Sequence, residues 1–327
     1  MTKKLFIAII LCSIIMFRFH AKAQTPGSNG KPWADTQGHF INAHGAGVMH
    51  YKGIYYLFGE IKKGTTWRVP GQDWEDYRVP AGGVSCYSSK DLKHWKYEGV
   101  ALASVKGEPD NDLDTGRVIE RPKVIYNSKT GRFVMWMHVD KKDYSYSQSG
   151  VAVSSTPTGP YHYIKSYKPN GEMARDMSVF KDDDGKAYLI FSSAQNNTME
   201  ICLLSDDYLS PTTTMQPLLV NRRREAPALF KNGGKYYLIT SSCTGWSPNA
   251  ATYSVADNVL GPWKEYGNPC KGPGADTTFA AQSTFVLPYH GKYIFMADIW
   301  NKTDLKKSGY LWLPLTVNNG RVEIIKK

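Results

Sequence analysis

The segment from Asn221 to Thr240 reads NRRREAPALFKNGGKYYLIT, and it predicts a β-hairpin. Two runs rich in β-forming residues, Ala228–Phe230 and Lys235–Thr240, flank the turn sequence Asn232-Gly-Gly. Such a turn supplies the residues with positive φ that a tight hairpin needs. Glu225 stands just before the first run, and taken alone it would be an ordinary surface charge. It gains importance because the same hairpin recurs along the chain.

Four further segments follow the same plan: a polar head residue, an apolar run, a turn that contains glycine, and a second apolar run. They begin at His44, Glu120, Asp176 and Gln282. In the first four units a third run then ends in a turn rich in serine, aspartate and proline (83–87, 150–154, 199–204 and 250–253). Five units of about fifty residues, each with about four strands, predict an all-β fold, a five-bladed β-propeller.

In a propeller the first strand of each blade lines the central channel. We therefore expect the head residues of the five units to converge on one mouth and to form a pocket rich in carboxylates. These residues are His44 or Gly45, Glu120, Asp176, Glu225 and Gln282. The runs Leu311–Thr316 and Arg321–Ile325 are expected to complete the last blade and close the ring.

The first 23 residues have the pattern of a secretory signal peptide. Lys3 and Lys4 form the charged region, Leu5–Phe17 the apolar region, and Ala21-Lys22-Ala23 a cleavage site. The apolar run is too short to span a bilayer. We therefore expect an exported protein, periplasmic or secreted, in which residues 24–327 form a single propeller domain without a membrane span.

Loss of that segment would lower the formal net charge from +11 to +7, because it contains Lys3, Lys4, Arg18 and Lys22. A moderately basic surface suits solubility or a weak affinity for acidic polysaccharide. The sequence has no basic helix or stripe with interleaved aromatic residues, which argues against nucleic-acid binding.

Four cysteines lie in residues 24–327, and none has the short spacing of a zinc site. They allow three disulfide pairings, but buried free thiols are favoured for Cys86, Cys202, Cys243 and Cys270. The acidic run Asp182-Asp-Asp-Gly185 resembles a calcium loop. Because glycine closes the same turn in other units, we interpret it as a hairpin turn. No cofactor or metal is predicted, and a structural calcium is left as an alternative.

One long insertion, Gly64–Val79, carries Trp67, Trp74 and Tyr77 among charged residues. Aromatic rings at the mouth of the channel would suit stacking on sugars. The alternative is a loop that packs on its own blade, and the sequence leaves both interpretations open.

Taken together, the motifs resemble those of glycoside hydrolase family 43 over nearly all of residues 24–327. The resemblance lies in Asp176 ahead of Ser-Val-Phe-Lys-Asp-Asp-Asp-Gly and in Glu225 ahead of Ala-Pro. It implies an inverting glycosidase in which Glu225 is the general acid and Asp176 tunes the pKa of that acid. The aspartate that serves as the catalytic base in the family is missing here. The segment Ile41–Gly47 places His44 or Gly45 at the aligned position.

In lacking this aspartate, the chain resembles the exo-β-1,3-galactanase branch of the family. In that branch a glutamate of the second blade and a glutamine of the fifth face the reacting sugar, and Glu120 and Gln282 stand at those positions. Gln282 would position water or replace the base, and Glu120 would be the base or bind sugar. The resemblance also implies sugar binding by His44, Glu60, Tyr144, Thr244, Trp246 and Trp300.

Inverting hydrolysis needs a protonated carboxyl group and an activated water on opposite faces of the sugar, and residues from different blades can provide that separation. The resemblance implies an exo-acting, inverting enzyme that releases galactose from β-1,3-galactan polysaccharide or oligosaccharide, and we expect it to be a monomer. Two alternatives stay open. One is an α-L-arabinofuranosidase or β-galactofuranosidase of the same family, and the other is an inactive propeller that only binds sugar. The retained pair Asp176 and Glu225 argues against the second, since a binding module does not need a tuned acid.

Overall fold

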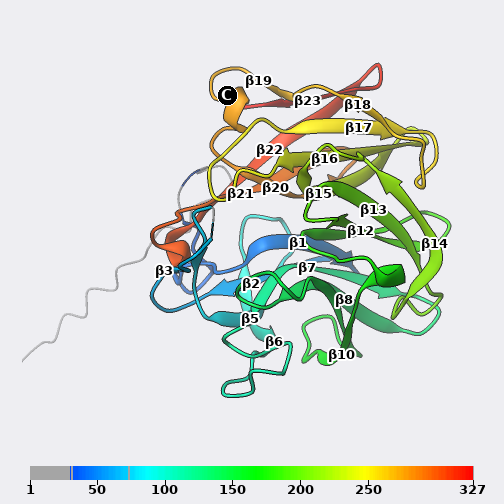
Figure 1. Ribbon diagram of the computed structural model, residues 1–327. Coiled ribbons are helices and arrows are strands. Elements are labelled where there is room, and N and C mark those ends of the chain that lie inside the picture. The colour runs from blue at the N-terminus through cyan, green and yellow to red at the C-terminus, as the bar shows by residue number, and fades with distance from the viewer. Residues whose placement is uncertain (1–29, 31, 73, 327) are drawn as a thin grey trace, which may run out of the picture.

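The computed structural model describes residue 30, residues 32–72 and residues 74–326. The signal peptide predicted for residues 1–23 lies outside this part. Five sheets of mainly antiparallel strands surround a central channel, which confirms the predicted five-bladed β-propeller (Figure 1). Helical backbone in the described part is confined to short 3₁₀ turns, and no helix there has the length and apolarity needed to cross a membrane.

Each of the first four blades has four strands in sequence order, and the fifth has a short additional one. Blade one contains β1 (His44–Tyr51), β2 (Ile54–Lys62), β5 (Ala81–Ser89) and β6 (Lys96–Leu102). Blade two contains β7 (Val118–Asn127), β8 (Arg132–Asp140), β9 (Gln148–Ser154) and β10 (His162–Tyr167). Blade three contains β11 (Met177–Lys181), β12 (Ala187–Ser193), β13 (Thr198–Leu204) and β14 (Pro211–Leu218). Blade four contains β15 (Arg224–Asn232), β16 (Lys235–Ser242), β17 (Thr252–Ala256) and β18 (Lys264–Tyr266). Blade five contains β20 (Gln282–Tyr289), β21 (Lys292–Ile299), β22 (Gly309–Asn318), β23 (Arg321–Ile325) and the parallel edge strand β19 (Cys270–Lys271).

The first long strand of each blade lies towards the centre of the ring, as the labels β1, β7, β15 and β20 show in Figure 1. The hairpin predicted from Asn221–Thr240 is β15 and β16, and Asn232 pairs with Lys235 across a two-residue turn. Gly233 and Gly234 both have positive φ, 56° and 79°. This is the backbone that a tight hairpin turn requires, and glycine adopts it without a steric penalty.

Five hydrophobic cores stabilise the ring, and each lies between two neighbouring blades. Successive side chains of a strand point to opposite faces of its sheet, so one blade contributes to two cores. In β16, Tyr237 and Ile239 pack towards blade five, whereas Tyr236 and Leu238 pack towards blade three. Both faces are therefore buried, which explains why these strands read as continuous apolar runs instead of alternating ones.

Blades one and five meet through side-chain contacts, because the last blade is built from the C-terminal strands alone. The final two strands, β22 and β23, pair as predicted. Tyr310 lies at this junction, where its hydroxyl donates to Ile41 O at 2.9 Å and accepts from Ala43 N at 3.0 Å. Trp33, on the segment that leads into blade one, packs on Tyr310 with ring centroids 5.0 Å apart.

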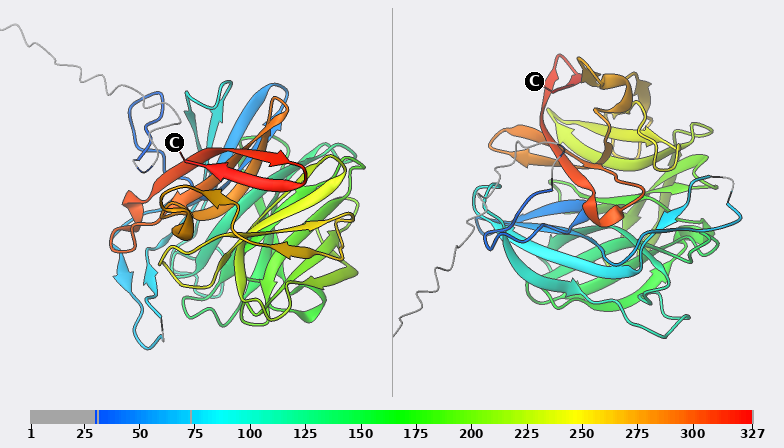
Figure 2. Two further views of the ribbon diagram at one scale, coloured as in Figure 1. Left: turned by 90° about the horizontal axis from the view of Figure 1, so that it is seen from above. Right: turned by 90° about the vertical axis from the view of Figure 1, so that its left-hand side faces the viewer.

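The insertion between β2 and β5 forms a small hairpin of its own, β3 (Trp67–Arg68) and β4 (Tyr77–Arg78). Figure 2 shows this hairpin projecting from one face of the ring. The four cysteines among the described residues are free, as predicted. Cys86, Cys202 and Cys270 are buried, whereas Cys243 is half-buried and lines the cavity at the mouth.

Candidate active site

A cavity of about 880 Å³ opens at one mouth of the channel and has lining residues from all five blades. This volume lies in the upper part of the usual range for ligand pockets, about 300–1,000 Å³. The residues that were predicted from sequence and line this cavity are Glu60, Glu120, Tyr144, Asp176, Glu225, Thr244, Trp246, Gln282 and Trp300. The predicted convergence of blade heads on one mouth therefore holds for these residues.

Three of the inner strands carry a β-bulge directly after the head residue. The pairing register shifts between His44 and Gly47, between Glu120 and Lys123, and between Glu225 and Ala228. The residue that follows each head has positive φ: 56° at Gly45, 53° at Arg121 and 56° at Ala226. A bulge of this kind bends the strand and re-aims side chains. It also explains Gly45, because a Cβ there would lie 2.9 Å from Glu60 Oε1 and 3.1 Å from Arg121 N.

Glu225 is held in an environment that favours its protonated form. Gln282 Nε2 donates to Glu225 Oε1 at 2.8 Å, and Asn196 Nδ2 lies 3.4 Å from Glu225 Oε2. Burial, together with the nearby negative charge of Asp176, raises the pKa of Glu225 to about 8, although the charge of Arg121 and the hydrogen bonds from Cys243 and Gln282 oppose the shift. Glu225 can therefore keep a proton at neutral pH, as a general acid must.

Asp176 is fixed by groups from two other blades. Arg121 Nε lies 2.8 Å from Asp176 Oδ2, and the backbone N–H of Ala226 donates to the same oxygen at 3.0 Å. The bulge at Ala226 thus connects Asp176 to the strand that carries Glu225. This arrangement fits the sequence-based prediction that Asp176 acts on Glu225 through its charge.

Gln282 uses all of its hydrogen-bonding groups. Its Oε1 accepts from Arg121 Nη2 at 2.7 Å and from Trp300 Nε1 at 3.1 Å. Its Nε2 donates to Glu225 and also to Ser241 Oγ at 3.1 Å. Because an amide oxygen has two lone pairs and an amide nitrogen two protons, the side chain is saturated in this arrangement.

Glu120 faces a protonated histidine. His138 Nδ1 lies 3.2 Å from Glu120 Oε2, and His138 Nε2 lies 3.0 Å from Asp140 Oδ2. Burial would lower the pKa of His138, but hydrogen bonds to these two carboxylates raise it to about 9. Burial likewise opposes ionisation of Glu120, yet the His138 hydrogen bond and the charge of Arg78 hold the pKa of Glu120 well below its usual range. Glu120 is therefore an ionised carboxylate.

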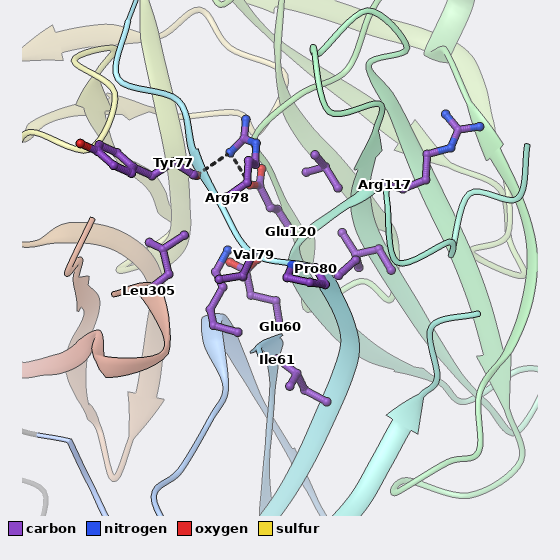
Figure 3. A pocket seen from close by; sticks show the side chains of 13 residues that line it. Glu60, Ile61, Tyr77, Arg78, Val79, Pro80, Arg117, Glu120 and Leu305 are labelled. Atoms are coloured by element: carbon purple, nitrogen blue, oxygen red, sulfur yellow. Dashed lines mark hydrogen bonds and ion pairs between the residues drawn. The ribbon is translucent and has the colours of Figure 1, made fainter. Parts of the chain in front are cut away.

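Glu60 lies beside Glu120 at the bottom of the pocket, and its Oε2 is 2.8 Å from Lys62 Nζ. Burial raises the pKa of Glu60, and the charge of Glu120 adds to this effect against the opposing charge of Lys62. Figure 3 shows Glu60 and Glu120 around a small cavity on this side, with Arg78 of the insertion between Tyr77 and Glu120. Arg78 Nη1 is 3.9 Å from Glu120 Oε1.

A buried lysine supports the blade heads from within the channel. Lys123 Nζ donates to Gly45 O at 2.7 Å and to Arg121 O at 3.3 Å, which are the two bulge residues of blades one and two. Burial, followed by the repulsion of Arg121, lowers the pKa of Lys123 to about 7. The aliphatic part of the Lys123 side chain also explains why residue 47 is glycine, because a Cβ there would lie 2.5 Å from Lys123 Cδ.

Aromatic rings form the walls of the pocket. Trp246 and Trp300 make an edge contact with ring centroids 5.2 Å apart, and Trp74 of the insertion lies 6.0 Å from Tyr144. Trp74 thus contributes to the mouth, as one of the two interpretations predicted. Tyr77 instead lines the small cavity, and Trp67 is 41% exposed on the projecting hairpin.

His44 is not among the residues that line the cavity, contrary to the expectation of direct sugar binding at this position. Its side chain is fully buried, with Nδ1 3.3 Å from Asp298 Oδ1 and its ring stacked on Tyr310 at 5.1 Å. It lies behind Trp300, with ring centroids 5.7 Å apart. In this position the His44 ring supports Trp300.

Glu120, His138 and Asp176 have ligand atoms within 4.8 Å of one another, which is close enough to hold a metal ion. Those atoms are already engaged, however. Both nitrogens of His138 face carboxylates, and Asp176 Oδ2 faces Arg121. A cation would have to displace these contacts, so the arrangement fits a charge-paired sugar site better than a metal centre.

Sequence reasoning missed several residues of this site. Arg121 bridges Asp176 and Gln282, His138 and Asp140 support Glu120, and Asn196 reaches Glu225. His138 could have been identified from the predicted hairpin, because it pairs with Glu120 in the register of β7 and β8. Arg224 points away from Glu225 to Thr240 and Ser242, because adjacent residues of a regular strand point to opposite faces.

Comparison with known proteins assigns the family. The family model described as Glycosyl hydrolases family 43 matches residues 46–294, more than half of the chain. The chain belongs to glycosyl hydrolase family 43. This confirms the resemblance inferred from the motifs around Asp176 and Glu225.

Solved family 43 structures are similar to most of the chain. The family 43 β-1,3-galactosidase BT3683, solved with galactodeoxynojirimycin, is 40% identical with a TM-score of 0.83, and the match covers 91% of this chain and 98% of that one. The exo-β-1,3-galactanase of Phanerochaete chrysosporium, solved with galactose, is 35% identical with a TM-score of 0.79, and covers 90% of this chain and 66% of its own.

A curated relative carries a different printed activity. The β-D-galactofuranosidase XynD of Aspergillus niger is 29% identical over 164 residues, which amount to 44% of this chain and 47% of that protein. The match therefore spans about half the length of this relative. Family 43 membership and the galactosidase neighbours together support a glycosidase.

Proposed function

We propose that this family 43 protein is an exo-acting, inverting β-1,3-galactosidase that removes terminal galactose from β-1,3-galactan. The observation that carries the proposal is the contact between Glu225 and Gln282, 2.8 Å, with the ionised Glu120 in the same pocket. In this arrangement Glu225 is the proton donor, Gln282 is its polar partner from the next blade, and Glu120 is a second carboxylate. The printed activities of the neighbouring β-1,3-galactosidase and exo-β-1,3-galactanase support the choice of sugar.

In this proposal Glu225 gives its proton to the oxygen that leaves with the rest of the chain. In the same step a water molecule attacks the anomeric carbon from the opposite face and gives its proton to Glu120, so the β-linkage gives α-galactose. Burial and like-charge repulsion from Asp176 keep Glu225 protonated before the reaction. After the transfer Glu225 is ionised, and Arg121 lies within reach to stabilise the new charge.

The roles of Gln282 and Glu120 follow from their partners. Gln282 Oε1 already accepts hydrogen bonds from Arg121 and Trp300, so accepting a further proton would require one of them to move. We therefore assign Gln282 to the orientation of Glu225, and Glu120 to the activation of water. The low pKa of Glu120 makes it a weak base, and this predicts a slow step that depends on close positioning.

The walls of the pocket favour attack on chain ends. Trp74 packs against Tyr144, and a Cβ on Gly245 would lie 3.2 Å from Trp74 Cε3. The insertion thereby reaches from the blade-two loop to the blade-four loop and is tied to blade five by an ion pair between Glu75 and Lys302. Such a covered mouth suits a terminal sugar, whereas internal cleavage needs an open groove.

A substrate panel tests this function. We expect release of galactose alone from β-1,3-galactan, without a ladder of intermediate oligomers at early times. Aryl β-galactofuranosides and aryl α-L-arabinofuranosides should be turned over at least about 100-fold less efficiently, since one misplaced sugar ring loses several aligned contacts. Preferred turnover of a galactofuranoside would favour the alternative activity, and early intermediate oligomers would exclude exo-action.

The place of action and the assembly state are part of the same proposal. The pattern of residues 1–23 supports export to the periplasm or the medium, where galactan polysaccharide would be accessible. The pocket takes its lining residues from all blades of a single chain, which is consistent with activity as a monomer.

A further inference from the structure

The carboxylates at the bottom of the pocket are already balanced by cations of the protein. The pairs are Glu60 with Lys62, Asp176 with Arg121, and Glu120 with His138. These short contacts hold each acid in place and neutralise much of its charge. Positive charge that remains at the rim is therefore available to a ligand.

Two guanidinium groups on the rim have no carboxylate partner in the described part of the chain. Arg175 and Arg223 both line the cavity. The arginines that form ion pairs in the described part of the chain are Arg78, Arg121 and Arg222. The rim also carries Asp143, which is exposed and accepts a hydrogen bond from Ser145 N at 3.1 Å. The unpaired charge on the rim is thus predominantly positive.

Arg175 is held in position by neutral groups alone. Its Nε donates to Ser147 Oγ at 3.3 Å and its Nη2 donates to Tyr144 O at 3.2 Å and to the Gln195 side chain. The guanidinium carbon also lies 5.5 Å from the centre of the Tyr144 ring. A planar guanidinium fixed in this way is ready to bind a carboxylate, since less side-chain entropy is lost on binding.

Arg223 lies at the same rim and is connected to the turn that positions Arg175. Its backbone N–H donates to Asn197 O at 3.4 Å, and its φ is 50°. In the turn between β12 and β13, Ala194, Gln195 and Asn196 all have positive φ. A run of left-handed residues is costly and is typical of functional loops, where the surroundings enforce it.

This part of the rim belongs to the leaving-group side of the site. Arg175 directly precedes Asp176, Arg223 lies two residues before Glu225, and Asn196 Nδ2 approaches Glu225 Oε2 at 3.4 Å. A general acid lies next to the oxygen that leaves with the remaining chain. Groups on the open side of Glu225 therefore meet the next sugar and its substituents.

We propose that Arg175 and Arg223 form a subsite for a carboxylate-bearing substituent, a uronic acid carried by the sugar on the leaving side of the bond. The proposal rests on the exo-galactosidase function proposed above and names a substrate class for it. Guanidinium groups suit this ligand because they bind carboxylates through charge-assisted hydrogen bonds, and among the described residues the Nη1 group of Arg175 has no hydrogen-bond partner. The cavity of about 880 Å³ provides room for a branched ligand beyond one terminal sugar.

Binding to the Glu225→Gln protein tests the subsite without turnover. The two probes are β-1,3-galactotriose with glucuronic acid on the sugar next to the non-reducing end, and the same molecule with glucose in place of the acid. Calorimetry at low ionic strength should give a dissociation constant at least about five-fold lower for the acidic probe, and salt should reduce this ratio. The double substitution Arg175→Gln and Arg223→Gln should bring the ratio close to one.

The matched control is a second double substitution, Arg132→Gln and Arg321→Gln, which removes the same charge from exposed positions that do not line the cavity. It should keep the preference for the acidic probe. Equal binding of both probes by the parent protein would overturn the subsite alone. A preference that survives loss of Arg175 and Arg223 would also overturn it. Failure of both probes to bind would overturn the proposed function and the subsite with it.

Discussion

Replacing Glu225 with glutamine is expected to lower kcat/KM on β-1,3-galacto-oligosaccharides by about 10²–10⁴-fold, because positioned proton transfer contributes that much to catalysis. Glutamine keeps the size of the side chain and can still contact Gln282, so the fold should be retained. Steady-state kinetics with purified galactobiose and galactotriose measure the loss. Near-normal turnover by the variant would exclude Glu225 as the acid.

Two controls separate the lost proton from a damaged site. Aryl galactosides with good leaving groups need little protonation, so the variant should lose much less activity on them. The pH profile gives the second control. Activity needs protonated Glu225, whose pKa is raised to about 8, so wild-type kcat/KM on oligosaccharides should fall as the pH rises through about 8. The variant should lack this alkaline limb. A wild-type profile that stays flat to high pH would contradict the assignment.

Substitutions of Gln282 and Glu120 are expected to have the second-largest effect. Gln282→Ala removes the partner of Glu225, Arg121 and Trp300, and Glu120→Gln removes the ionised carboxylate opposite. Each should lower kcat by about 10²-fold or more, since positioning and base catalysis each contribute effects of that size. Wild-type rates in both variants on β-1,3-galactan would exclude both residues from the reaction.

Added azide distinguishes the two residues. Azide is a nucleophile that needs no base, so it should restore turnover only where the base has been lost. We expect rescue of Glu120→Gln with formation of an α-galactosyl azide, and no rescue of Gln282→Ala. Rescue of Gln282→Ala alone would show that the amide is the base. Ser241→Ala serves as a comparison, because it removes a hydrogen-bond partner of Gln282 without altering Glu120.

The fold could be predicted because each blade repeats the same local signals. Glycine turns such as Gly233-Gly234 fix the hairpins, and strands such as β16 feed both neighbouring cores with alternate side chains. Head residues such as Glu120 and Glu225 were found because the first strand of every blade begins at the same mouth. These signals are local or periodic, so one sequence is enough to reveal them.

Arg121 could not be predicted for a physical reason. In a regular strand Glu120 and Arg121 would point to opposite faces, which would place Arg121 outside the pocket. The bulge with φ of 53° at Arg121 breaks that alternation and brings both side chains towards the site. Positive φ at a non-glycine residue has no clear sequence signature, so the Arg121 contacts with Asp176 and Gln282 needed the structure.

His44 shows the reverse case. Its position at the head of blade one predicted a place at the mouth, but Asp298 and Tyr310 of blade five hold its ring in the junction between the blades. Contacts across that junction join the two ends of the ring. The residues that make them are separated by more than 250 positions in the chain. Neither periodicity nor turn chemistry reports such a contact.

Inverting removal of galactose from the chain end can be followed by proton NMR of the first turnovers. The purified protein would be mixed with reduced β-1,3-galactotetraose, and the anomeric signals would be followed before mutarotation mixes them. We expect α-galactose as the first free sugar, together with an oligosaccharide shortened by one unit. Initial appearance of β-galactose, or of galactobiose before galactose, would contradict it.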